Sequence, residues 1–126
     1  MYVSLWAGNI GSEDALADYT ALDYSDDSAP LRSPFTDAFR IDSDDIDEDF
    51  IESIFRESPS DDLAVLLADC SYADAVIAAF SALNGGKLPE QYQACILIYD
   101  YLYEPETPLP QSAFAWLGSM KITYQA

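Results

Sequence analysis

The sequence predicts an α+β fold: an antiparallel sheet of about four strands, packed with helices on at least one face, in a single compact domain over residues 1–126. Three observations lead to this prediction. Residues 71–84 repeat their apolar side chains with the helical period, and residues 93–103 are apolar on both faces of a strand. The chain has 126 residues and is half apolar, so it can build one core but not a second domain.

The first half of the chain shows one clear strand and two helix starts. Residues 2–7 alternate over two usable faces, which predicts a short strand. Ser12 is followed by two acids and predicts a helix N-cap, and Ser33 with Pro34 predicts another. Residues 50–55 favour a strand because β-branched and aromatic residues cluster there, although a turn and a half of helix also fits.

Two serines are expected to begin the helices of the second half. Ser60 would cap a short helix that contains residues 63–67. Ser71, with Asp74 three positions on, resembles a capping box that opens the firmest predicted helix. That helix is expected to end at Asn84, because two glycines follow it.

Two strands are predicted after this helix. Residues 93–103 should be central in the sheet, and Tyr99, Tyr101 and Tyr103 would share one face that suits a protein interface. Residues 114–124 alternate and should form a half-buried strand, in a hairpin with 93–103. The larger apolar residues of the last strand would share one face: Phe114, Trp116, Met120, Ile122 and Tyr124.

The charge is strongly unbalanced. Five Lys and Arg against 23 Asp and Glu give a net charge of −18, and there is no histidine. A chain this acidic is repelled by nucleic-acid backbones and anionic membranes, so neither is an expected partner. Residues 42–62 hold ten acids and a single base, and so carry half of the net charge.

No catalytic, metal or cofactor site is expected. Asp45, Asp47 and Asp49 have the spacing of a calcium loop, but Phe50 replaces its glycine and Arg56 its bidentate acid. Any two of the 23 acids could be drawn as a glycosidase pair, so such a pairing carries no information. We therefore expect that the protein is not an enzyme.

The compartment is expected to be the cytoplasm. The N-terminus has no basic or apolar region of a signal peptide, and the longest apolar run, residues 94–99, is too short to cross a membrane. Cys70 and Cys95 lack metal or redox spacing, which favours two buried, reduced thiols.

The acidic run has two interpretations. It could be a solvated, solubilising surface, as most charge runs are. Apolar residues interrupt it, however, and should anchor it to the fold, so that its fixed charges can match a basic partner. We favour the second interpretation, and expect Phe50 and Phe55 to be structural. The interrupting residues are Ile46, Phe50, Ile51, Ile54 and Phe55.

Several blocks of the chain resemble immunity protein 22 of bacterial polymorphic toxin systems. The blocks keep the same order over nearly the whole length, whereas Ser43-Asp44 departs from the aromatic character expected there. They comprise residues 3–9, Ser12-Glu13-Asp14, Ser33-Pro34-Phe35 through Phe39, Ile41-Asp42, residues 47–52, the helix start at Ser71-Tyr72 and the strand at residues 94–99.

The resemblance implies a small cytoplasmic protein that binds and neutralises a cognate toxin. We expect a basic toxin, with nucleases among the candidates, and leave the oligomeric state open. The alternative is an acidic nucleic-acid mimic or adaptor that binds basic host proteins. The toxin-binding residues inferred from the chain itself are Asp42, Asp44, Asp45, Asp47, Glu48, Asp49, Glu52, Tyr99, Tyr101 and Tyr103.

Overall fold

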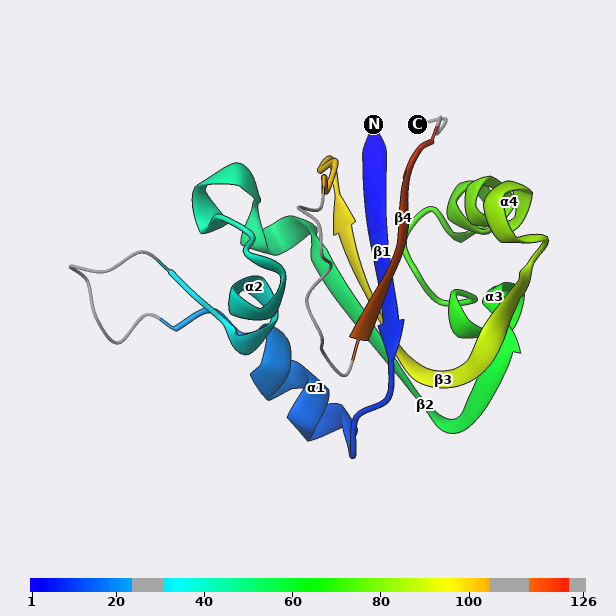
Figure 1. Ribbon diagram of the computed structural model, residues 1–126, viewed down its shortest axis with the longest axis horizontal. Helices are drawn as coiled ribbons and strands as arrows, with labels where there is room; N and C mark the ends of the chain where they lie inside the picture. Colours follow the sequence, from blue (N-terminus) through cyan, green and yellow to red (C-terminus); the bar gives the residue numbers. More distant parts are fainter. Residues whose placement is uncertain (24–30, 105–113, 123–126) are drawn as a thin grey trace.

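A computed structural model describes residues 1–23, 31–104 and 114–122. Over these residues the chain forms an antiparallel sheet of four strands in the order β2-β3-β1-β4 (Figure 1). Helices flank the sheet, so the predicted α+β class is confirmed. The strands are β1 (Tyr2–Gly8), β2 (Ile51–Asp62), β3 (Lys87–Tyr99) and β4 (Phe114–Lys121).

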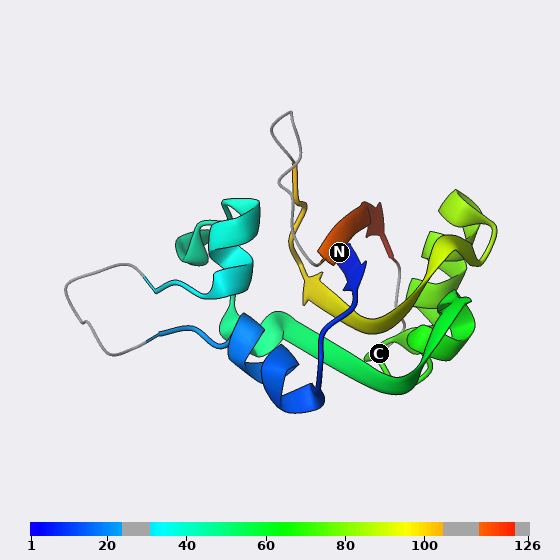
Figure 2. The ribbon, with the colours of Figure 1, turned by 60° about the horizontal axis from the view of Figure 1, so that its bottom comes forward.

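The helices divide between the two faces of the sheet (Figure 2). One pair covers the face that carries Trp6, Ile96 and Ile98, and the other pair covers the face that carries Leu5 and Leu97. The first pair is α1 (Glu13–Thr20) and α2 (Pro34–Phe39); the second is α3 (Leu63–Leu66) and α4 (Ala73–Asn84). Two short 3-10 turns, η1 (Ser43–Asp45) and η2 (Glu48–Phe50), lead from α2 into β2.

β1 and β3 form the centre of the sheet; the central position was predicted for β3, and β1 shares it. Trp6 lies opposite Ile96 in the register, and both are fully buried under α2. Leu5 lies opposite Leu97, and both are fully buried under α3 and α4. Each central strand therefore supplies alternate side chains to two separate cores.

The predicted hairpin between the last two strands is wrong. β4 pairs with β1, in a register that places Tyr2 opposite Lys121 and Gly8 opposite Phe114. A strand has two hydrogen-bonding edges, and both edges of β3 are occupied, by β1 and by β2.

The predicted alternation of the last strand also fails beyond Trp116. Leu5 lies opposite Gly118 while Trp6 lies opposite Trp116, so Leu117 is an extra residue in a β-bulge. Trp116 packs on the α2 side, whereas Met120 packs on the α4 side. Ile122 follows Met120, and Tyr124 lies outside the described residues.

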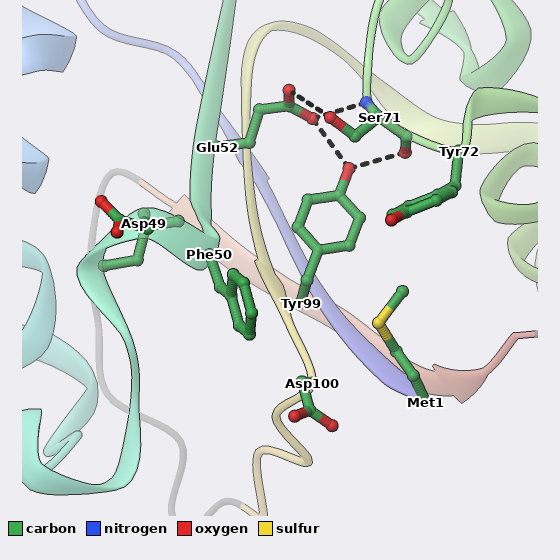
Figure 3. Close-up of a pocket in the computed structure, with 9 residues that line it drawn as sticks. Met1, Asp49, Phe50, Glu52, Ser71, Tyr72, Tyr99 and Asp100 are labelled. Carbon is green, nitrogen blue, oxygen red and sulfur yellow. Dashed lines mark hydrogen bonds between the residues drawn. The ribbon is translucent and has the colours of Figure 1, made fainter. Parts of the chain in front are cut away.

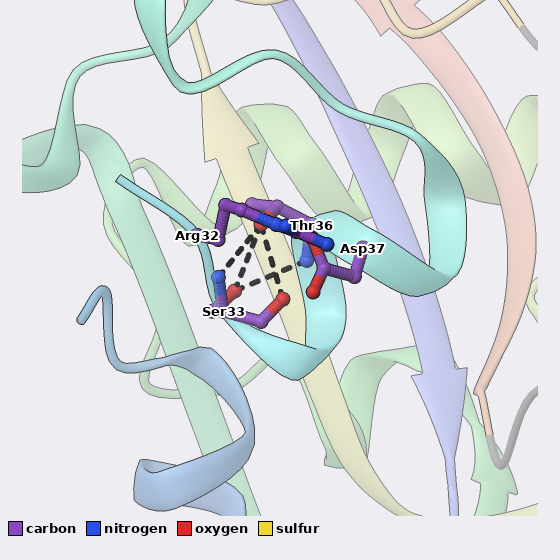
Figure 4. A network of polar contacts seen from close by, with 4 residues as sticks. All are labelled: Arg32, Ser33, Thr36 and Asp37. Atoms are coloured by element: carbon purple, nitrogen blue, oxygen red, sulfur yellow. Dashed lines mark hydrogen bonds and ion pairs between the residues drawn. The ribbon is translucent and has the colours of Figure 1, made fainter. Parts of the chain in front are cut away.

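The first two predicted helix caps are confirmed. The Ser12 hydroxyl accepts from the Ala15 N–H at 3.0 Å. Ser33 forms a capping box with Thr36, in which the Thr36 N–H donates to Ser33 Oγ at 3.0 Å and the Ser33 N–H donates to Thr36 Oγ1 at 2.8 Å (Figure 4). Arg32 and Asp37 form an ion pair beside it at 2.7 Å.

The other two predicted caps are wrong. Ser60 lies within β2, and Asp62 caps α3 by accepting from the Ala64 N–H at 2.9 Å. Tyr72, not Ser71, is the N-cap of α4, with φ at 56° and no side-chain capping bond. Ser71 precedes the N-cap by one residue, and its N–H and hydroxyl both donate to Glu52 instead.

Candidate functional site

The acidic segment between α2 and β2 is folded onto the protein. Asp42 Oδ1 accepts from the Asp44 N–H at 2.9 Å, and Asp47 Oδ1 accepts from the Asp49 N–H at 3.0 Å. These bonds shape the two 3-10 turns. Ile46 lies between the turns and packs against the α2 core, so the expected anchoring is confirmed.

The turns present their carboxylates to solvent. Among the described side chains, none of these aspartates has a Lys or Arg within ion-pair distance. Arg56, the one base of the acidic run, pairs instead with Asp69 at 2.8 Å. The side chain of Glu48 lies outside the described residues. The exposed members of the predicted site are Asp42, Asp44, Asp45, Asp47 and Asp49.

The predicted face of three tyrosines does not exist. β3 ends at Tyr99, and Asp100 reverses the chain with φ at 58°. Beyond it, the Tyr101 N–H donates to the Tyr2 carbonyl and the Tyr103 N–H to Ser4 Oγ, which breaks the alternation of the strand.

The tyrosines consequently belong to different environments. Tyr99 is buried in the core of α3 and α4, whereas Tyr103 is buried in the α2 core, where its hydroxyl donates to the Phe39 carbonyl at 3.1 Å. Tyr101 is half-buried near the acidic turns. Burial raises the pKa of Tyr101 to about 12, and the negative charge of Asp45 contributes to the shift.

Glu52 connects three distant parts of the chain. Its Oε1 accepts from the Tyr99 hydroxyl at 2.7 Å and from the Ser71 N–H at 2.9 Å, and its Oε2 accepts from the Ser71 hydroxyl at 3.2 Å (Figure 3). Burial first, and then the bond to Glu52, raise the pKa of Tyr99 above its ordinary value. Glu52 thus ties β2 to the end of β3 and to the start of α4.

A pocket of about 420 Å³ opens beside Glu52. Phe50 faces it from η2 and Tyr72 from the start of α4, with Tyr99 between them (Figure 3). Its lining comprises Met1, Asp49, Phe50, Ile51, Glu52, Ser71, Tyr72, Tyr99 and Asp100.

Two of the pocket residues correct the sequence prediction. Phe50, expected to be structural, is 44% exposed, because β2 begins at the next residue and its inward-facing positions start with Ile51. Tyr72, which falls in the apolar repeat predicted over residues 71–84, is 46% exposed because it precedes the first turn of α4 as its N-cap residue. An aromatic residue at the end of an acidic run was the signal that could have identified Phe50.

The backbone is strained on two sides of the pocket. Three non-glycine residues in the described ranges have positive φ, and two of them, Tyr72 and Asp100, line it. The left-handed region costs a non-glycine residue about 1–3 kcal/mol, and such conformations cluster at functional sites.

The described residues contain no group of three or more His, Cys, Asp or Glu arranged to hold a metal ion. No helix in the same ranges is long and apolar enough to cross a membrane. Cys70 and Cys95 are free and buried, as predicted.

These features define an acidic α+β protein with an anchored, charged surface beside an aromatic pocket. A family model described as Immunity protein 22 matches residues 3–121, so the chain belongs to that family. The family implies neutralisation of a toxin, and a toxin as the partner. Searches of curated proteins and of solved structures found no match.

Proposed function

We propose that this protein neutralises its cognate toxin in the cytoplasm by binding directly to a basic surface of the toxin domain. The observation that carries the proposal is the set of exposed aspartates at η1 and η2, which have no ion-pair partners among the described side chains. The carboxylates of Asp42 and Asp47 are held in place by the backbone N–H groups of Asp44 and Asp49. Fixed carboxylates meet a cationic partner without first being reorganised. A nuclease is the toxin class that fits best, because its surface is built to attract phosphates.

Charge and packing would contribute to different steps of binding. A net charge of −18 attracts a basic partner over long distances. Such steering raises association rates by about 10- to 1,000-fold at low salt. Contacts of exposed aromatic residues should govern dissociation, because most differences in affinity lie in the dissociation rate.

The test compares two variants that each lose four charges. The first replaces Asp44, Asp45, Asp47 and Asp49 by Asn, whose side-chain oxygen can still accept the bond at residue 47. The control, on α1 and β2, combines Glu13→Gln, Asp14→Asn, Asp18→Asn and Glu57→Gln.

Association with the toxin domain encoded immediately upstream is measured by stopped flow at several ionic strengths. We expect the first variant to associate about tenfold more slowly at low salt, with a flatter salt dependence, and the control to stay closer to the wild type. Equal rates for the two variants would place the interface elsewhere. Absence of binding by the wild type would contradict the proposed function.

A further inference from the structure

We propose that the pocket beside Glu52 receives the guanidinium group of one arginine side chain of the toxin. This inference rests on the proposed function and adds to it the chemistry of the anchoring contact. The acidic turns would draw the toxin in, and the pocket would then hold one of its side chains. The pocket adjoins the turns directly, since Asp49 and Phe50 of η2 contribute to its lining.

The walls of the pocket suit a flat cation. Phe50 and Tyr72 are among the most exposed large hydrophobic residues of the described chain, and both face the same opening (Figure 3). The Tyr72 ring lies edge-to-face on Tyr99, with 6.0 Å between ring centroids, which holds it over the pocket. Aromatic faces attract cations, and Arg more often than Lys. The volume of about 420 Å³ lies within the range of small-ligand pockets.

The charged side chains that line the pocket are all acidic among the described residues. Glu52 lies at one end and Asp100 at the other, with the Tyr99 ring between them (Figure 3). None of the described residues that line the pocket is a Lys or an Arg. The N-terminal ammonium group of Met1 donates to the Ile122 carbonyl at 3.2 Å. A cation that enters therefore meets carboxylates at both ends.

Arginine fits this arrangement better than the other side chains a toxin could offer. A guanidinium group stacks on aromatic rings while its edge donates to carboxylates, and it loses its hydration more readily than an ammonium group. An apolar side chain would instead cover the negative charges of Glu52 and Asp100 without bringing a cation to compensate them, which is unfavourable. The two rings and two carboxylates thus favour one occupant.

The first test measures the dissociation constant for the upstream toxin domain by calorimetry. Phe50→Ala and Tyr72→Ala should each raise it about tenfold, whereas Tyr72→Phe should keep it close to the wild-type value because the ring remains. Asp100→Asn should raise it several-fold, and Asn tolerates the left-handed conformation at this position.

Two substitutions outside the pocket are matched controls. Tyr2→Ala removes a tyrosine that is 42% exposed, and Asp18→Asn removes one exposed carboxylate from α1. Both should leave the dissociation constant within about twofold of the wild type, as surface changes away from a binding site do. Thermal melting of every variant shows whether it is folded. If the folded Phe50→Ala and Tyr72→Ala variants bind as tightly as the controls, the proposal is overturned.

The second test identifies the occupant. Each exposed arginine of the toxin is replaced by alanine and by lysine, and each replacement is combined with Tyr72→Ala in a double-mutant cycle. We expect one toxin arginine to be coupled to Tyr72. Its replacement should weaken toxin binding to the wild-type protein about tenfold, but should barely change toxin binding to the Tyr72→Ala variant. If Tyr72 couples to none of the toxin's exposed arginines, or if lysine in place of the coupled arginine binds as tightly, the proposal is overturned. A wild type that binds the toxin in that same experiment would leave the proposed function standing.

Discussion

Glu52 shows how one side chain can serve both the fold and the candidate site. Its two carboxylate oxygens accept bonds from Tyr99 and Ser71, which come from elements far apart in the sequence. The same carboxylate lines the pocket. The sequence predicted Glu52 as a binding residue because it lies in an acidic run, but nothing in the run indicated its bonds. Those bonds depend on the meeting of β2, β3 and α4.

Replacing Glu52 by alanine should destabilise the protein by about 1–3 kcal/mol, because the N–H and hydroxyl of Ser71 lose their acceptor and Tyr99 keeps only the Ser71 carbonyl. Glu52→Gln keeps one acceptor oxygen, so its effect should be less than half as large. Urea unfolding followed by circular dichroism measures both variants. Equal stability of Glu52→Ala and the wild type would show that these bonds contribute nothing.

The two thiols should be inert in the folded protein. Burial raises the pKa of Cys70 from 9.0 to about 11 and that of Cys95 from 9.0 to about 12. At pH 8 the thiolate fraction of Cys70 is then about a hundredfold below that of an ordinary thiol. Ellman's reagent should therefore react with both thiols quickly in urea and at least about a hundredfold more slowly without it.

The raised pKa values of the two thiols also determine how the stability of the folded protein changes with pH. Because the pKa values are raised in the folded state, the stabilisation associated with the neutral thiols is complete below about pH 9 and is lost as the pH rises through 11 and 12. Rapid labelling of the folded protein at pH 8 would contradict the burial of these side chains.

At the scale of elements, local patterns were reliable wherever neighbouring residues decide the outcome. The Ser12 and Ser33 caps formed as predicted, because each side chain bonds to a backbone amide three positions ahead. The expected cap at Ser71 failed because α4 begins one residue later, after Tyr72 in the left-handed conformation, and Ser71 bonds to Glu52, nineteen residues away in sequence. The strand through Tyr99 ended early because Asp100 turns the chain.

The β-bulge in β4 predicts that Gly118 cannot be replaced without loss of stability. Gly118 has φ at 146°, and a Cβ there would approach Leu83 Cδ2 to 2.9 Å. Leu83 is 52% exposed and can move, so the backbone conformation should account for most of the effect. Gly118→Ala should destabilise the protein by about 1–3 kcal/mol.

Gly11→Ala is the matched control. Its φ is not positive and a Cβ there would meet nothing within 4 Å, so the change should be within about 0.5 kcal/mol of zero or slightly stabilising. Chemical denaturation of both variants tests the pair. Equal effects would show that the bulge does not require glycine.

At the scale of the whole molecule, the sequence predicted the class of fold but not its topology. Helices were predicted on at least one face of the sheet, and they cover both, because β1 and β3 each present two apolar faces. The pairing of β4 with β1 was beyond local patterns, because it depends on which strand edges remain open. The pocket was missed for the same reason: its lining comes from four separate parts of the chain.

The net charge should influence folding and binding in opposite directions. With −18 charges, the carboxylates repel one another in the compact state. Added salt screens this repulsion, so the melting temperature should rise between about 10 mM and 200 mM sodium chloride. A melting temperature that falls over this range would show that attractive ion pairs dominate. Toxin binding, by contrast, should weaken as salt is added.

The central claim is direct binding of a basic toxin, and titration calorimetry with the upstream toxin domain at low and high salt tests it most directly. We expect a tight one-to-one complex whose dissociation constant rises with salt while binding persists, because the aromatic contacts are not screened. Absence of binding at low salt, or an affinity unchanged by salt, would contradict the account.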